Sequence, residues 1–214
     1  MGQTTTTDNT TVSYCRRKDE RPGEILKAAL EEFSINGFAA TRLNDVASRA
    51  GISKGTIYLY FNSKEELFVE TVRERILPHF EKLENLSEQY EGSAKEILRE
   101  QLKTIYKELL SADAIFIPKL IISEGNRFPE LKKFYYEEII KRIHKVIKSV
   151  IERGITSGEF RPSALNWEQQ ATLSPALAAA IWKTVFDEYA SLDLDAYLET
   201  HIDLLLYGLD KRCE

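Results

Sequence analysis

The sequence predicts an all-α protein. In nearly every segment of the 214-residue chain, apolar residues recur at spacings of three and four, whereas the strict alternation of a half-buried strand is absent. Serines, glycines and prolines stand between these segments, where helices begin and end. Hydrophobic residues make up 43% of the chain and charged residues 29%, the balance expected of a globular protein that buries its own core.

The composition also excludes several functional classes. The longest apolar run, Ala176–Trp182, is far shorter than the roughly 20 residues that span a bilayer. The polar N-terminus lacks the apolar core of a secretory signal. We therefore expect a cytoplasmic protein without a membrane segment, and a disordered tail over residues 1–20.

Residue types that carry catalysis or metal binding are scattered. Two cysteines lie near opposite ends of the chain, and three histidines lie far apart without a second ligand at helical spacing. A glycine-rich phosphate loop and a nucleophile elbow are both missing. Adjacent carboxylates such as Glu31 and Glu32 fall on strongly charged helical faces. The sequence therefore predicts neither an enzyme nor a metal or cofactor site.

Short helices fill the first third of the chain. The first is expected from Pro22 to Asn36, because proline suits a first turn, and Gly37 ends it. Thr41 is the expected N-cap of a second helix, which Gly51 breaks. Apolar residues of this second helix recur at i, i+3, i+4 and i+7, which makes a single buried face.

The segment that follows, GISKGTIYLYFNSKEEL (Gly51–Leu67), carries three aromatic residues behind a Ser-Lys-Gly-Thr run. Ser53 can cap a helix that begins at Lys54, and Ile57 and Phe61 then face inward. The residues left on the outward face are Lys54, Gly55, Thr56, Tyr58 and Leu59.

Ser63 is the expected cap of a fourth helix, Lys64 to about Gln89, and Glu66 completes a capping box. Two short helices joined by a glycine turn and braced on both sides make a helix-turn-helix, which places its second helix in the major groove of DNA. The local charge agrees with this interpretation. Between Thr41 and Lys64 lie four cations and one anion, although the whole chain carries a net charge of −5.

The residues around the short second helix have distinct expected roles. Gly55 removes a side chain where the backbone approaches DNA, and Leu59 points outward beside it. Lys54, Thr56 and Tyr58 are expected to enter the groove. Phosphates are expected to be held by Thr41, Arg42, Ser53, Tyr60 and Lys64, together with the first amides of the following helix. Core packing remains the alternative for Tyr58 and Tyr60.

Arginine and lysine residues also precede the first expected helix. They are Arg16, Arg17, Lys18 and Arg21. Two interpretations stay open for them, an arm that enters the minor groove of DNA and a solvated tail.

The same stretch resembles the TetR family of bacterial transcriptional regulators. The residues that carry the resemblance are Gly37-Phe38, Thr41, Asp45-Val46-Ala47, Ala50 to Tyr58, Tyr60-Phe61 and Ser63 to Leu67. Arg42 departs from the family, which often has Thr or Ser there. The resemblance implies a helix-turn-helix DNA-binding domain, residues 21–68, followed by a helical effector-binding and dimerisation domain, residues 69–214. It also implies a homodimer that binds palindromic operator DNA.

Apolar periodicity predicts helices throughout the second region. The expected helices are Ser93 to Leu110, one that holds Ile115, Ile117 and Leu120 to Ile122 and stops near Phe128-Pro129, Pro129 to Gly154, Asn166 to Tyr189 and Leu194 to Leu209. By the resemblance, the last two dimerise. The alanine-rich Ala176 to Ala180 would permit close approach, and apolar area would come from Trp182, Phe186, Leu204, Leu205 and Tyr207. The alternative is that these residues form the core of one subunit.

Four prolines interrupt these helices, which prevents continuous helix packing and leaves room for a cavity: Pro78, Pro118, Pro129 and Pro175. The expected cavity wall consists of Ile105, Phe116, Leu120, Tyr135 and Trp182, each of which is alternatively packed core. Ionic groups are scarce in this pattern, so we expect a small hydrophobic or amphipathic effector that releases the DNA. The competing hypothesis is a DNA-binding protein of the same fold without a small-molecule switch.

Overall fold

A computed structural model describes residues 10–89, 92–112 and 114–211 of the chain. The regular elements of these residues are helical, and an isolated bridge between Phe160 and Asp210 is the one extended pairing among them. The predicted all-α fold is therefore confirmed. The chain forms two compact units, Met1–Val72 and Arg73–Glu214. This boundary, like the one predicted at residue 68, falls inside helix α4 (Lys64–Gln89).

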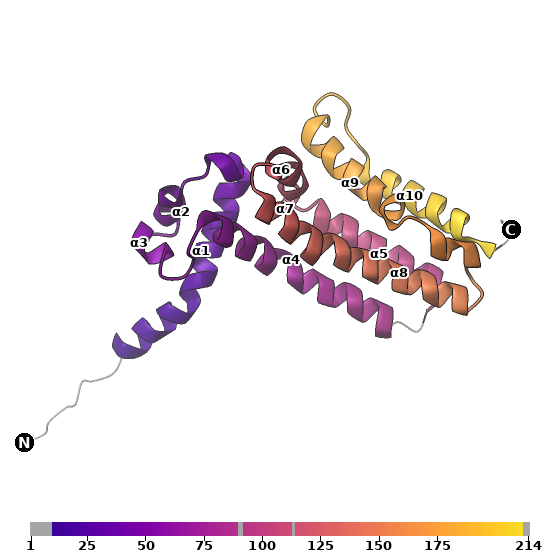
Figure 1. Ribbon diagram of the computed structural model, residues 1–214, viewed down its shortest axis with the longest axis horizontal. Helices are drawn as coiled ribbons and strands as arrows, with labels where there is room; N and C mark the ends of the chain where they lie inside the picture. Colours follow the sequence, from indigo (N-terminus) through magenta and orange to yellow (C-terminus); the bar gives the residue numbers. More distant parts are fainter. Residues whose placement is uncertain (1–9, 90–91, 113, 212–214) are drawn as a thin grey trace, which may run out of the picture. The chain divides into compact units, whose positions relative to one another are not determined.

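The first unit contains α1 (Thr10–Ala40), α2 (Leu43–Arg49) and α3 (Lys54–Ile57) (Figure 1). Because α1 begins at Thr10, residues 10–20 are helical where a disordered tail was expected, and Pro22 lies inside the helix. The chain kinks at Gly37, whose φ of 73° is rarely adopted by residues with a side chain.

Three phenylalanines form the centre of this unit. The ring centre of Phe33 lies 5.7 Å from that of Phe38, and Phe68 meets both edge-on at 5.2 and 5.4 Å. All three are buried. Each such side chain contributes about 1.5–3 kcal/mol of burial free energy. Helices as short as α2 and α3 need this support, because helices of one or two turns are unstable alone.

Side-chain caps set the ends of the short helices. The backbone amide of Thr56 donates to the Ser53 hydroxyl at 3.1 Å, and that of Glu66 donates to the Ser63 hydroxyl at 3.0 Å. Both predicted serine caps are therefore confirmed. The Glu66 carboxylate accepts from the Asn62 amide at 2.7 Å instead of from Ser63, so the predicted capping box is displaced by one residue.

The N-cap predicted at Thr41 is wrong. Arg42 occupies that position of α2 without a side-chain cap. The Thr41 hydroxyl instead donates to the carbonyl oxygens of Gly37, at 2.7 Å, and Glu32, at 3.1 Å. Thr41 therefore closes the end of α1 rather than the start of α2.

The second unit is built from the rest of α4 and the later helices: α5 (Ala94–Leu109), α6 (Phe116–Glu124), α7 (Pro129–Tyr135), α8 (Lys141–Thr156), α9 (Gln169–Val185) and α10 (Leu194–Leu209). Helix α5 runs beside α8 and also packs on α10, while α6 packs on α9 (Figure 1). The α5–α8 seam buries Ile97, Leu98, Leu102, Val146, Ile147 and Val150. These residues follow the predicted helical stripes.

One irregularity was not predicted in this unit. The helix expected from Pro129 to Gly154 is divided by a π-helical turn, Tyr136–Ile140, and continues to Thr156. Such wide turns are rare, and they occur frequently at functional sites. The chain also forms a short 3-10 turn at Pro162–Asn166, so α9 begins at Gln169 rather than at the expected Asn166.

Candidate nucleic-acid interface and effector cavity

The recognition helix α3 presents the predicted outward residues to solvent. Lys54 and Gly55 are exposed, Tyr58 keeps 49% of its surface and Leu59 keeps 80%, while Thr56 is half-buried. Opposite them, Ile57 and Phe61 are buried in the core of the unit, as predicted. An 80% exposed leucine contributes little burial free energy to the fold.

Gly55 is not required by the fold. A Cβ atom placed there would meet its nearest neighbour, the Ser53 hydroxyl oxygen, at 3.6 Å, which is an ordinary contact. The backbone conformation at Gly55 is also helical. Nothing among the described residues therefore selects glycine at this position.

The predicted basic patch is smaller than the sequence suggested. The Arg49 guanidinium pairs with Glu32 at 2.6 Å and with Glu31 at 2.9 Å. The Lys64 ammonium donates to three carbonyl oxygens, of Phe38, Ala39 and Thr41, at 2.8 to 3.2 Å. Two of the four cations are thus occupied within the unit.

Arg42 and Lys54 are the cations that remain on this surface. Both are exposed, and neither forms an ion pair with any residue that the structure describes. The Lys54 ammonium lies 5.8 Å from the ring centre of Tyr58. These two side chains carry the charge available for a polyanion.

Of the other residues predicted to hold phosphates, Ser53 is exposed, Tyr60 is half-buried and Thr41 is buried. Thr41 is 2% exposed and its hydroxyl is engaged, so it does not belong to the outward face. The Ser53 hydroxyl is exposed and lies 2.9 Å from that of Thr56, while Tyr60 is half-buried. The first turn of α4 contains Glu65 and Glu66, which oppose an anion at that helix end. The side chains of Arg16, Arg17 and Lys18 lie outside the described residues.

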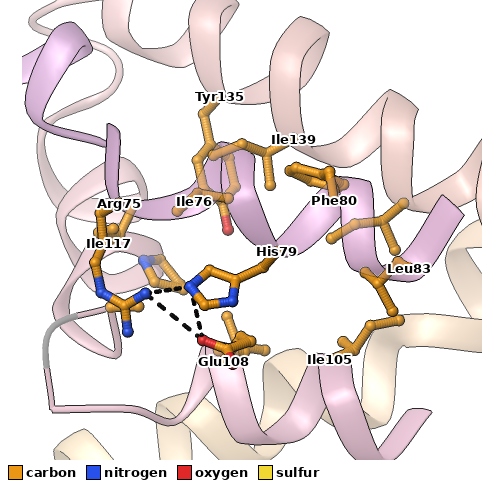
Figure 2. A pocket seen from close by; sticks show the side chains of 14 residues that line it. Arg75, Ile76, His79, Phe80, Leu83, Ile105, Glu108, Ile117, Tyr135 and Ile139 are labelled. Atoms are coloured by element: carbon orange, nitrogen blue, oxygen red, sulfur yellow. Dashed lines mark hydrogen bonds and ion pairs between the residues drawn. The ribbon is translucent and has the colours of Figure 1, made fainter. Parts of the chain in front are cut away.

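The second unit contains an apolar cavity of about 80 Å³ (Figure 2). For comparison, an engineered cavity of about 150 Å³ admits benzene. Its apolar lining comes from α4, α5, α6 with the turn before it, and the α7–α8 segment: Ile76, Phe80, Leu83, Ile105, Leu109, Ala114, Ile117, Pro118, Ile139 and Ile143. Residues from four separate helical segments therefore enclose one apolar space, which is the usual construction of a small-molecule site.

A polar cluster lines one side of the cavity. The Arg75 guanidinium contacts the Nε2 atom of His79 at 2.5 Å and lies 3.6 Å from the Glu108 carboxylate, which is 3.1 Å from His79 (Figure 2). A second nitrogen of Arg75 donates to the Ser111 hydroxyl at 3.1 Å. The expectation that ionic groups are scarce around the cavity is therefore wrong. The i, i+4 spacing of Arg75 and His79, beside the Ile76, Phe80 and Leu83 stripe, was the sequence signal for it.

Two of the five predicted wall residues, Ile105 and Tyr135, line the cavity. Leu120 is buried elsewhere, and Phe116 is half-buried without reaching the cavity. Trp182 lies on the surface of α9, 41% exposed, where its indole N–H donates to the Ala190 carbonyl at 2.7 Å. Which side chains of a helix line the cavity depends on which face of that helix is directed toward it.

Helices α9 and α10 and the segment that connects them expose a set of large apolar side chains. Its members keep between 40 and 82% of their surface: Leu177, Trp182, Val185, Phe186, Tyr189, Leu204 and Tyr207. By contrast, Ala176, Ala179, Ala180 and Leu205 are buried within the chain itself. The residues predicted for a dimer interface therefore divide between internal core and solvent-exposed surface.

No helix among the described residues has the length and apolar character needed to cross a bilayer. Within the same residues, no group of three or more histidine, cysteine, aspartate or glutamate side chains is placed to hold a metal ion.

These features define a class, namely helix-turn-helix proteins with a second helical unit that encloses an apolar cavity. Comparison with known families agrees. Residues 25–71 match the family described as bacterial regulatory proteins, tetR family, and residues 96–203 match the C-terminal domain of AefR-like transcriptional repressors. The second match spans half of the chain. The chain belongs to the TetR family of transcriptional regulators.

Individual relatives show the same relationship. The uncharacterized HTH-type regulator YerO of Bacillus subtilis is 32% identical over 123 residues, which cover 56% of this chain and only 42% of YerO. The fatty acid metabolism regulator protein of the same organism is 29% identical over 148 residues, 67% of this chain and 74% of that protein. The crystal structure of Bacillus subtilis FadR in complex with stearoyl-CoA shares the fold, with a TM-score of 0.73 at 24% identity over 87% of this chain and 98% of that one.

Proposed function

We propose that this protein is a repressor that binds operator DNA as a homodimer and is released by a small hydrophobic or amphipathic effector. The observation that carries the proposal is the apolar cavity with its Arg75–His79–Glu108 cluster. An enclosed apolar space with a few convergent polar groups is the form that ligand sites take. The complex of a related protein with stearoyl-CoA supports an effector that contains a hydrocarbon chain.

Helix α4 offers a route from the cavity to the DNA-binding unit. Its later residues Ile76, Phe80 and Leu83 line the cavity, while its first turns bury Leu67 and Phe68 in the helix-turn-helix unit. A ligand that displaces α4 moves both recognition helices of a dimer. A preference of about 1–3 kcal/mol for the displaced state lowers DNA affinity roughly 5- to 150-fold.

The exposed apolar surface of α9 and α10 supports dimerisation. One recognition helix reads few base pairs, and two of them related by a two-fold axis read an inverted repeat. An apolar surface that another copy covers would account for exposed residues such as Tyr189 and Tyr207, which are 82% and 73% exposed.

The proposal is tested by fluorescence anisotropy of the full chain on labelled fragments of the DNA upstream of its own gene. Hydrophobic metabolites and drugs are titrated into the complex. Release of the DNA by a compound that also binds the free protein is the expected result. DNA binding that no compound reverses would contradict the proposal and favour the regulator without a small-molecule switch.

A further inference from the structure

The polar side of the cavity indicates which head group the effector carries. Four polar side chains line the cavity: Arg75, His79, Glu108 and Tyr135. The first three hold one another, as described above. The Tyr135 hydroxyl points into the cavity toward them (Figure 2). Tyr135 forms no hydrogen bond with any residue that the structure describes.

Tyr135 is a hydrogen-bond donor placed in the cavity. Protein atoms surround the residue, yet it keeps some accessible surface because it borders the cavity. Burial raises the pKa of Tyr135 to about 12, so the hydroxyl keeps its proton at neutral pH. A hydroxyl that faces an apolar cavity without a protein partner gains a hydrogen bond when a ligand supplies an acceptor.

The neighbouring charges restrict the acceptor to an uncharged group. The Arg75 guanidinium and the Glu108 carboxylate lie 3.6 Å apart and cancel when His79 is neutral. Because the pair carries no net charge, a ligand carboxylate or a ligand ammonium gains no net attraction to offset its cost of leaving water, and each also faces one like charge. A neutral carbonyl oxygen meets neither penalty.

We infer that the effector is an uncharged carbonyl compound, such as an ester, thioester, lactone or ketone, whose carbonyl oxygen accepts from Tyr135. Its hydrocarbon part lies between Phe80, Leu83 and Ile105, which are labelled along the other side of the cavity in Figure 2. This inference rests on the proposed effector site. A cavity of about 80 Å³ receives a short chain, and a longer chain requires the lining side chains to move apart.

Calorimetric titration of the DNA-free full chain tests the inference with probes of equal chain length: methyl hexanoate, hexanoate and hexylamine. The titrations are performed at about pH 8, where imidazoles are ordinarily neutral. Methyl hexanoate is expected to bind at least about tenfold more tightly than either charged probe. Tighter binding of hexanoate or hexylamine, or no binding of methyl hexanoate, would overturn the inference.

Two variants separate the roles of the hydroxyl and the charge. Tyr135→Phe is expected to weaken methyl hexanoate binding by about three- to tenfold, whereas the matched control Tyr136→Phe, at a 49% exposed neighbour, leaves it unchanged. Glu108→Gln removes the opposing carboxylate, so the affinity for hexanoate relative to that for methyl hexanoate is expected to rise by about tenfold or more. Equal affinity of wild type and Tyr135→Phe for methyl hexanoate would exclude the hydrogen bond.

The outcomes also distinguish this inference from the proposed function. A charged compound that binds the cavity and releases DNA would leave the ligand-responsive repressor intact and would refute only the uncharged carbonyl head group. A probe that binds as expected without releasing DNA would support the head group and contradict the switch.

Discussion

The ammonium of Lys64 donates a hydrogen bond to the carbonyl oxygen of Phe38 at 2.8 Å and lies 4.5 Å from the centre of the Phe38 ring. Two further carbonyls, of Ala39 and Thr41, accept from the same ammonium. Because α1 ends at Ala40, its last carbonyls have no helical partner, and Lys64 supplies a donor to those of Phe38 and Ala39. A residue expected to hold a DNA phosphate is thus part of the fold of the unit.

Lys64→Met keeps the apolar stem and removes the three donors. We expect the unfolding free energy of the helix-turn-helix unit to fall by about 1–2 kcal/mol, because part-buried carbonyls lose their partner. Urea denaturation followed by circular dichroism measures this loss. The salt dependence of DNA binding by the folded variant should be unchanged. A decrease of about one unit in its slope would show that Lys64 contacts a phosphate after all.

Gly55→Ala separates folding from DNA binding. The added Cβ fits at 3.6 Å from Ser53, and alanine favours a helix over glycine. Stability should therefore stay equal or rise by up to about 1 kcal/mol. Operator affinity should fall by at least about tenfold, or 1.4 kcal/mol, because the methyl group lies where DNA approaches. If an anisotropy titration finds wild-type affinity for the variant, DNA does not approach the backbone closely at this residue.

Lys54→Ala combined with Tyr58→Phe tests the groove contacts. The lost contacts should cost about 1–3 kcal/mol and relax the preference for operator over unrelated DNA. Lys107→Ala, an exposed lysine of the second unit, is the matched control for the change in net charge. Unchanged affinity and unchanged salt slope in the double variant would show that another face of the unit meets DNA.

A buried histidine makes stability depend on pH. The Nε2 atom of His201 lies 3.1 Å from the Thr172 carbonyl oxygen, and its Nδ1 atom lies 2.9 Å from the Tyr106 hydroxyl. Since a carbonyl only accepts, Nε2 carries the proton and Nδ1 accepts from Tyr106. Burial lowers the pKa of His201. Burial also lowers the pKa of His144.

The unfolded chain therefore binds the proton first as the pH falls. The stability that the neutral imidazole contributes is fully present above the unfolded pKa of about 6.5, and it is lost as the pH falls from there toward the lower folded value. Urea denaturation between about pH 8 and pH 5 should show a smaller loss for His201→Gln than for wild type. If wild type and His201→Gln lose the same stability, His201 does not contribute to the pH dependence. The variant His144→Gln measures the contribution of the second histidine in the same way.

Paired substitutions on α10 test the homodimer. Leu204 and Tyr207 are 68% and 73% exposed, so glutamate at both positions should leave the subunit folded. We expect sedimentation equilibrium to show a dimer for wild type and a monomer for Leu204→Glu with Tyr207→Glu. Operator binding should weaken in parallel, because the two half-sites are then read separately. A wild-type monomer at micromolar concentration, alone and on DNA, would contradict dimerisation.

The sequence by itself determined the helices and the helix-turn-helix. Ser53 and Ser63 cap helices where they were predicted, and Gly51, with a φ of 65°, follows the end of α2 as predicted. These are local signals, since a cap or an apolar stripe depends on residues three or four positions apart. The same local pattern separates the inward Ile57 from the outward Leu59 on the recognition helix.

Only the tertiary structure decided which polar groups remain available. Arg49 finds Glu32 across 17 residues of sequence, and Lys64 finds the Phe38 carbonyl across 26. The packing of α4 against α5 places Arg75 3.6 Å from Glu108 at the cavity. The Tyr135 hydroxyl, on another side of the cavity, has no partner among the described residues. Such pairings depend on how helices turn and pack against one another. Helical periodicity fixes which side chains share a face, but it does not determine which other helix that face meets.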